Sequence, residues 1–343
     1  MKLFARICLT AALVVSPFAI LEAQSARTLV SRGDQARQEY DFSSAIQHYQ
    51  SALSRSEDEQ ERLSISEKIT QCENGQSMLE YSSRPEVIST ITVPRSDFFL
   101  YYSHFADRAW KKGENGQAIL FDSGDNTLVM PLRGEDGHFD LYSASRQGDG
   151  GWSPLENLGP NVNSAGDEVF ATLADGGKRL YFSSNGLSGM GGYDIFVSEW
   201  DNASGTWSAP ENLGFPFSSP ADDLLFCNTP DGNYSLFASN RKCAADSMTV
   251  YLLKFDNTPI KKAVSSPEEA RRVAALRPRA NLLDKAIEDT HLEANMEDGT
   301  FKKYYSSVSR YSTVKDSIKT LKNELSESRK LYSSSSESDR TVI

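Results

Sequence analysis

The sequence is poor in the residues that build catalytic and metal centres. Only four cysteines and four histidines occur among 343 residues. They form neither a CxxC pair nor an HExxH pattern, the spacings that zinc sites and metalloproteases use. Glycine-rich phosphate loops, dinucleotide-binding fingerprints and GxSxG nucleophile elbows are missing as well. The sequence therefore predicts no catalytic residue and no cofactor, and we expect a protein that is not an enzyme.

Long apolar runs and basic clusters are also missing beyond the first 23 residues. No stretch there approaches the ~18 consecutive apolar residues that a membrane-spanning helix needs. The formal net charge of −11 repels phosphate backbones. We therefore expect no transmembrane span in the mature chain and no nucleic-acid partner.

The N-terminus has the pattern of a secretory signal peptide over residues 1–23. Lys2 and Arg6 form a short basic region, an apolar run covers residues 7–21, and Ala23 supplies a small residue for cleavage. The alternative is a buried first helix. The pattern favours export of the mature chain.

Three cysteines remain after residue 23, namely Cys72, Cys227 and Cys243. Export permits disulfides, and Cys227 and Cys243 lie 16 positions apart within one repeat. They form either a disulfide or two buried free thiols, and the sequence does not decide between these alternatives.

Residues 24–85 have helical spacing of apolar and small side chains and no proline before Pro85. The segments Gly33–Ala36, Tyr40–Phe42 and Ala45–Leu53 resemble a tetratricopeptide repeat, which implies two packed helices, and another helix is expected over about 57–80. A generic helical hairpin is the alternative. A lone repeat cannot bury its own face, so it needs neighbours or a partner. The candidates for a partner-binding groove are Gln35, Tyr40, His48 and Tyr49.

Residues 86–260 change to short β-branched and aromatic runs separated by Gly, Asp, Asn and Ser, which predicts an all-β domain. The expected strands include 87–93, 98–102, 118–121 and 127–130. A repeat with a period of about 55 residues is the strongest internal signal. Its matched pairs are Trp152–Gly159 with Trp207–Gly214, Asp140–Tyr142 with Asp194–Phe196, Asp167–Phe170 with Asp222–Leu225, and Leu180–Asn185 with Ser235–Asn240.

Each repeat unit is typical of a small antiparallel meander, the unit of a propeller blade. Ser183–Gly186 and Gly191–Phe196 resemble the WD-like repeats of TolB-type propellers. Three clear units are present, with a degenerate fourth from Val87 to Trp110. Together with the helical segment, residues 27–257 resemble a family of Gram-negative envelope proteins, here without the OmpA-like C-terminal domain that such proteins often carry.

That resemblance implies a multidomain α+β fold. It would consist of an N-terminal α-helical hairpin, an all-β propeller-like body of three to four blades, and C-terminal helices. It also implies a periplasmic or outer-membrane-associated location.

Two acidic pairs occupy equivalent positions of the repeat: Asp167 with Glu168, and Asp222 with Asp223. Such pairs are candidates for calcium ligands or for paired carboxylates in glycoside hydrolysis. Their repetition favours a shared structural duty instead, such as hydrogen bonding to neighbouring backbone. By the same reasoning, the repeat-equivalent Trp152 and Trp207 are expected to pack within the blades rather than bind sugars.

The C-terminal part divides into a helical segment over residues 261–332 and a disordered tail over 333–343. Ser266–Glu269 is a capping box with proline at the first helical position. Apolar residues between Tyr311 and Leu325 repeat at 3-4-3-4 spacing for fewer than three heptads. That helix either packs on the body or oligomerises.

Two functional hypotheses follow from different classes of protein. The first is an exported envelope scaffold that binds envelope or secretion-machinery proteins through the helical and propeller surfaces. The second is a glycan-binding or glycan-hydrolysing propeller protein. A pair of carboxylates in an open cleft would favour the second hypothesis, and a groove on the helices would favour the first.

Overall fold

The computed structural model describes residues 25–104, 108–112, 118–122, 126–229 and 232–278. The predicted signal peptide, the predicted helix beyond Tyr311 and the predicted tail lie outside these residues. The chain divides into two compact units, one up to Glu73 and one from Asn74. They are called unit 1 and unit 2 below. Among the described residues, no helix has the length and apolar character to cross a membrane.

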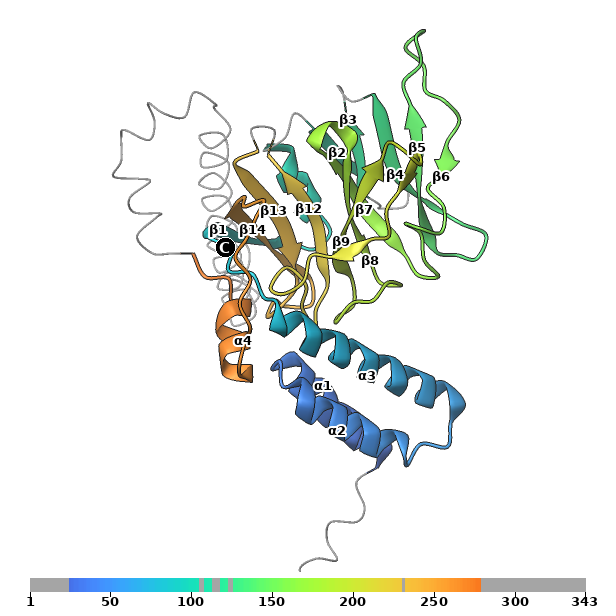
Figure 1. Ribbon diagram of the computed structural model, residues 1–343. Helices are drawn as coiled ribbons and strands as arrows, with labels where there is room; N and C mark the ends of the chain where they lie inside the picture. Colours follow the sequence, from blue (N-terminus) through green and yellow to red (C-terminus); the bar gives the residue numbers. More distant parts are fainter. Residues whose placement is uncertain (1–24, 105–107, 113–117, 123–125, 230–231, 279–343) are drawn as a thin grey trace, which may run out of the picture. The chain divides into compact units, whose positions relative to one another are not determined.

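Unit 1 is entirely helical, as the sequence predicts, and the expected third helix is present. Ser25 begins the first helix by accepting a hydrogen bond from the Thr28 N–H, and Asp41 begins the second by accepting one from the Ser44 N–H. The boundary between the units falls within the third helix. The helices are α1 (Ala26–Gln38), α2 (Phe42–Leu53) and α3 (Glu59–Glu80) (Figure 1).

The hairpin of α1 and α2 is held by a close approach at Gly33. Any Cβ placed there would lie within 2.8 Å of Tyr49 Cζ, so only glycine fits. Tyr49 and Ala45 are fully buried in α2, and Phe42 is nearly so. The small residues in the sequence therefore mark the point where the two helices touch.

Unit 2 consists of antiparallel sheets and a short helix, α4 (Pro267–Ala274). Ser266 caps α4 by accepting a hydrogen bond from the Glu269 N–H, as the sequence predicts, and the Glu269 carboxylate accepts from the Ser265 N–H rather than from that of Ser266. The described residues form four separate sheets and no closed barrel or propeller ring. Together with unit 1 they make an α+β protein.

Each of the four sheets is built mainly from consecutive strands (Figure 1). The first pairs β2 (Arg108–Lys112) with β3 (Ala118–Asp122), and the second joins β4 (Thr127–Arg133), β5 (Phe139–Ser145) and β6 (Glu156–Asn157). The third contains β7 (Glu168–Ala174), β8 (Arg179–Ser184) and β9 (Asp194–Asp201), with β10 (Thr206–Trp207) and β11 (Glu211–Asn212) both paired to β9. The fourth contains β12 (Asp223–Asn228), β13 (Tyr234–Ser239), β14 (Ser247–Lys254) and β1 (Val87–Pro94).

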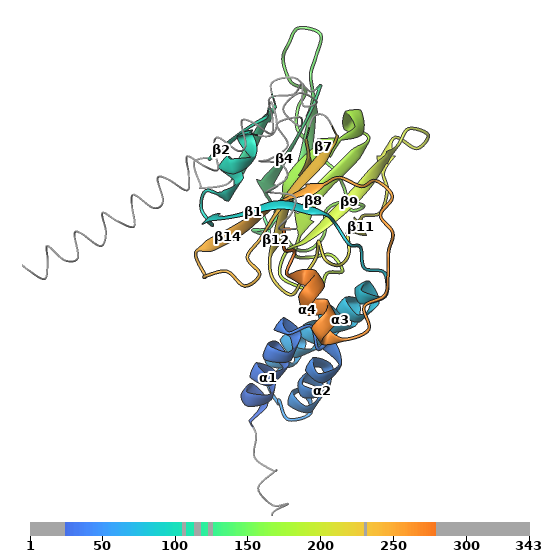
Figure 2. The same cartoon turned by 90° about the vertical axis from the view of Figure 1, so that its left-hand side faces the viewer.

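The strand β1 does not begin a separate repeat unit, as the sequence suggested for Val87–Trp110. It pairs with β14 from Val87 opposite Leu253 to Pro94 opposite Ser247 (Figure 2). The first strand of unit 2 thus completes its last sheet. An unpaired β14 edge would expose a row of backbone donors and acceptors, and β1 covers it.

The predicted strand over Phe98–Tyr102 is wrong, because this segment is the 3-10 helix η2 (Phe98–His104). Phe98, Phe99, Tyr101 and Tyr102 are all buried. A strand would direct neighbouring side chains to opposite faces, whereas a 3-10 turn stacks residues three apart. The helical turn therefore lets four aromatic side chains enter one core.

The repeat in the sequence corresponds to a repeat in the backbone. Strand β7 matches β12, and each contains a bulge at which one buried or half-buried residue has a left-handed conformation. These residues are Phe170 and Leu225, both with φ of 54°. Left-handed backbone is costly for side chains of this size. The same strained bulge in both copies shows that the two sheets share one local design.

Candidate functional site

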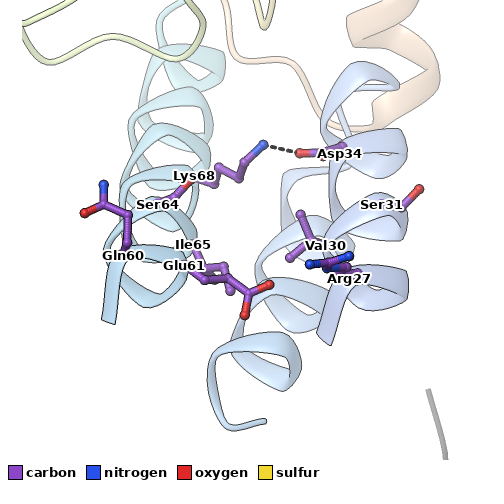
Figure 3. Close-up of a pocket in the computed structure, with 9 residues that line it drawn as sticks. All are labelled: Arg27, Val30, Ser31, Asp34, Gln60, Glu61, Ser64, Ile65 and Lys68. Carbon is purple, nitrogen blue, oxygen red and sulfur yellow. Dashed lines mark hydrogen bonds and ion pairs between the residues drawn. The ribbon is translucent and has the colours of Figure 1, made fainter. Parts of the chain in front are cut away.

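A groove of about 510 Å³ lies on unit 1 between α1 and the first half of α3. Figure 3 shows Lys68 and Asp34 meeting between the two helices, whereas Gln60 and Ser31 point to the outer sides of α3 and α1. Buried Ile65 and half-buried Val30 supply its apolar part. The lining residues are Arg27, Val30, Ser31, Asp34, Gln60, Glu61, Ser64, Ile65 and Lys68.

An ion pair spans one end of the groove. Lys68 Nζ on α3 lies 2.6 Å from Asp34 Oδ1 on α1 (Figure 3). The Tyr49 hydroxyl donates to the same oxygen at 2.7 Å. Burial alone would raise the pKa of Asp34, but the hydrogen bonds from Lys68 and Tyr49 hold it below its usual value. Asp34 is therefore an ionised anchor that joins all three helices of unit 1.

Other polar side chains of the groove face solvent. Arg27 and Ser31 on α1 are exposed, and so are Gln60 and Ser64 on α3. These side chains can both donate and accept hydrogen bonds, through one guanidinium, one amide and two hydroxyl groups. An extended peptide backbone requires partners of both kinds. The groove combines these groups with an apolar patch, which is a combination suited to binding rather than to catalysis.

None of the four groove candidates predicted from the sequence lines this groove. Tyr49 and Tyr40 are buried, His48 is half-buried, and Gln35 is exposed elsewhere on α1. Tyr49 contributes indirectly through its bond to Asp34. The tetratricopeptide-like pattern placed the candidate residues on α1, on α2 and between them. The groove is formed by α1 and α3, and no sequence motif distinguishes the polar residues of α3 that line it.

The two acidic pairs join neighbouring sheets of unit 2. Asp167 accepts from the Phe139 N–H at 2.9 Å, and Asp222 accepts from the Tyr193 N–H at 3.3 Å. Phe139 and Tyr193 occupy equivalent positions, each immediately before the aspartate of the repeat. These bonds confirm the expectation that the acidic pairs bind neighbouring backbone.

The second member of each pair is buried within the sheets. Glu168 accepts hydrogen bonds from Ser164 and Ser184, and burial raises its pKa. Asp223 forms an ion pair with Arg241, and it also accepts from Ser219. Burial raises the pKa of Asp223, and the Arg241 guanidinium partly offsets this effect.

These carboxylates thus have protein donors as partners. No group of three or more histidine, cysteine or acidic residues suited to a metal ion occurs in the part of the chain that the structure describes. The calcium interpretation of Asp167, Glu168, Asp222 and Asp223 gains no support from their surroundings.

The remaining sequence candidates lie in three different environments. Cys227 is buried in β12 and Cys243 follows β13, and neither forms a disulfide. Cys227 lies opposite Leu236 on β13, whereas Cys243 Sγ contacts the backbone oxygen of Ser239, three residues further along that strand, so about 10 Å of strand separates the two positions. Trp207 is buried in the core as expected, whereas Trp152 is 37% exposed with the Arg146 guanidinium over its ring.

Replacing Asp222 by alanine is expected to lower the free energy of unfolding of unit 2 by about 1–3 kcal/mol, because the Tyr193 N–H loses its acceptor. Urea denaturation followed by tryptophan fluorescence measures this change. Alanine at the exposed Asp246 is the matched control and should change the free energy by less than about 0.5 kcal/mol. Equal effects of both substitutions would contradict the structural role of Asp222.

Comparison with known proteins gives no family assignment. No model of a protein family matches the chain, and no curated protein matches it.

Proposed function

We propose that this protein is an exported envelope scaffold that binds an extended peptide segment of a partner protein in the groove between α1 and α3. The observation that carries the proposal is the groove itself, in which solvent-facing polar groups of two helices surround a small apolar patch. The partner belongs to the envelope or secretion machinery. Export rests on the signal-peptide pattern of residues 1–23.

The finer fold assignment is part of the same proposal. Unit 1 is a tetratricopeptide-like hairpin followed by the first helix of a next repeat, so that α1 and α3 take equivalent places. Unit 2 is a propeller-like array of three to four blades. The four separate sheets, and the closure of the last one by β1, support this interpretation. Both architectures commonly present rigid surfaces to other proteins.

A glycan-active function would need carboxylates that are open to a substrate. The acidic pairs instead accept hydrogen bonds from the protein, as Asp167 does from Phe139 and Glu168 does from Ser164. No observation on the described residues favours hydrolysis over binding. We therefore retain protein binding as the proposed function.

Site-specific photo-cross-linking in intact envelopes tests the groove. A photoreactive amino acid is placed at Ser31 or Ser64, which line the groove, and for comparison at Ser51 or Glu67, which are exposed outside it. We expect one partner to be cross-linked from the two groove positions and not from the two comparison positions. Mass spectrometry of the cross-linked product identifies the partner.

A second arm tests whether the contact depends on groove chemistry. Replacing Gln60 by arginine fills the groove and adds charge, and should reduce cross-linking from Ser64 at least about tenfold, the loss expected for one or two hydrogen bonds. Lysine at exposed Glu67 is the control. Equal cross-linking from all four positions, or recovery of glycan alone, would rule out the groove as a protein-binding site.

A further inference from the structure

A side-chain hydrogen bond joins two strands of the second sheet of unit 2, and the third sheet has the same two residue types at the equivalent positions. Asn157 on β6 donates from Nδ2 to Asp140 Oδ2 on β5 at 2.9 Å. Asn157 lies opposite Tyr142, two residues after Asp140. This bond fastens the short edge strand β6 to β5, in a place where Asn157 is exposed.

The third sheet has the same residues in the same register. Asn212 on β11 lies opposite Phe196 on β9, two residues after Asp194. The equivalent bond is not formed, because Asp194 Oδ1 and Asn212 Nδ2 are both buried without a hydrogen-bond partner. A buried donor and a buried acceptor are thus left unpaired where the first copy pairs them, at a cost of about 1–3 kcal/mol for each group.

Local hydrogen bonds fix Asn212 Oδ1 and Asp194 Oδ2. Asn212 Oδ1 accepts hydrogen bonds from the Gly214 N–H at 2.8 Å and from the Ser218 hydroxyl at 2.7 Å. In the second sheet, Asn157 Oδ1 accepts equivalent bonds from Gly159 and Asn163. Asp194 Oδ2 accepts from the backbone N–H groups of Met190 and Gly191. The Ser218 hydroxyl also favours the ionised form of Asp194, and Asp194 Oδ1 and Asn212 Nδ2 are the atoms of these two side chains that lack a hydrogen-bond partner.

The charged groups around Asp194 come from several elements. Asp223 lies on β12, with Arg241 as its partner after β13. Asp222, which binds the Tyr193 N–H and Arg95, lies on the segment before β12. On the other side, Glu168 of β7 binds Ser184, the residue of β8 opposite Asp194.

Burial, reinforced by the nearby Asp223 carboxylate, raises the pKa of Asp194 to about 7. A protonated Oδ1 carries its own hydrogen and is a poor acceptor for an amide N–H. The Asp194–Asn212 bond therefore requires the ionised carboxylate.

We propose that Asp194 and Asn212 form a proton-controlled latch between β9 and β11. When Asp194 is ionised, Oδ1 accepts a hydrogen bond from Asn212 Nδ2, as Asp140 does from Asn157, and the latch is closed. When Asp194 takes up a proton, the bond opens. Besides this bond, β11 pairs with β9 over only two residues, and the adjacent Leu213 N–H donates to Ile195, so the latch adds to a short contact.

The latch acts on a segment that leads to the fourth sheet. Phe215 to Phe217 follow β11, and Arg241 donates to the backbone oxygens of Pro216 and Phe217. The backbone N–H of Leu213 also donates to Ile195 on β9. Closing the latch therefore tightens the connection between the third and fourth sheets as the pH rises past neutrality.

Nuclear magnetic resonance of the full chain with 15N-labelled asparagine tests the proposal. The Asn212 side-chain amide resonances, assigned by their loss in an Asn212→Ser variant, should shift between pH of about 5.5 and 8.5 with one midpoint near 7. The Asn157 amide is the internal control and should stay constant, because its bond is already made. An Asn212 amide that does not respond over this range would overturn the latch.

Variants assign the response to Asp194. In Asp194→Asn the pH dependence of the Asn212 amide should disappear, whereas Asp140→Asn should leave it unchanged. In Asn212→Ser the carbon-13 carboxyl resonance of Asp194 should titrate about 1 pH unit higher, because the ionised form loses a donor. An unchanged carboxyl midpoint in that variant would contradict the latch even if Asp194→Asn did not fold.

Thermal stability supplies a second readout with a defined sign. The folded protein keeps a proton on Asp194 that the unfolded chain releases near pH 3.8, so this group contributes stability below about pH 4 that is lost as the pH rises to about 7. Glu168 and Asp223 shift in the same direction, so the comparison is between wild type and variant. The Asp194→Asn protein should lose less stability than wild type over this interval, and an equal loss would contradict burial of an ionising Asp194.

Discussion

Replacing Arg241 by alanine is expected to lower the free energy of unfolding of unit 2 by about 3–5 kcal/mol, because it leaves the buried Asp223 carboxylate without its counter-charge. Both side chains are buried, with exposed fractions of 6% for Arg241 and 0% for Asp223. The same guanidinium also donates to Ser239 and to the backbone oxygens of Pro216 and Phe217. One substitution thus removes an ion pair and several bonds that join different segments.

Urea denaturation followed by tryptophan fluorescence measures this loss selectively. All four tryptophans of the chain lie in unit 2, so the fluorescence signal reports on that unit. Alanine at Arg272 is the matched control, because its ion pair with Glu268 is exposed on α4 and is expected to contribute less than about 0.5 kcal/mol. A loss of less than about 1 kcal/mol for Arg241→Ala would show that the buried pair is not a main support of unit 2.

Replacing Gly33 by valine is expected to destabilise unit 1 by about 3 kcal/mol, because the new side chain overlaps the buried ring of Tyr49. Displacement of that ring also breaks the bond from the Tyr49 hydroxyl to Asp34, which anchors one end of the groove. Thermal unfolding followed by the helical circular dichroism signal at 222 nm measures the change in the full chain.

Valine at Gln35 is the control for Gly33, because it introduces the same β-branched side chain at an exposed position of α1. Its effect should stay within about 0.5 kcal/mol. If both variants melted alike, the close packing of α1 against α2 would not be the reason for glycine at position 33.

The sequence by itself determined the elements whose causes are local. The first two helices of unit 1 are capped by Ser25 and Asp41 and have small residues where they cross, and each of these features depends on residues a few positions apart. The repeat of about 55 residues predicted matching sheets, because equal sequences with equal turn residues form equal meanders. The structural duty of Asp167 and Asp222 also followed from their equivalent positions.

Only the tertiary structure decided features that join distant parts of the chain. The pairing of β1 with β14 brings together residues about 160 positions apart, and no local signal marks β1 as the last strand of the fourth sheet. The 3-10 helix at Phe98 is a similar case, because four aromatic residues within five positions suit a strand by composition and a helical turn by burial. Tertiary packing overrode the local preference there.

The candidate site also has features that the sequence predicted and features that only the tertiary structure decided. The sequence indicated a helical binding unit, but it pointed to Tyr40 and Tyr49, whose aromatic rings are buried in the structure. The groove depends on which faces of α1 and α3 remain uncovered after packing, and Arg27, Gln60 and Ser64 carry no pattern that distinguishes them from other polar surface residues. Local sequence therefore determines the helices, the strands and the repeat. The groove arises from helix packing, because burial of one face of each helix determines which face remains exposed for a partner.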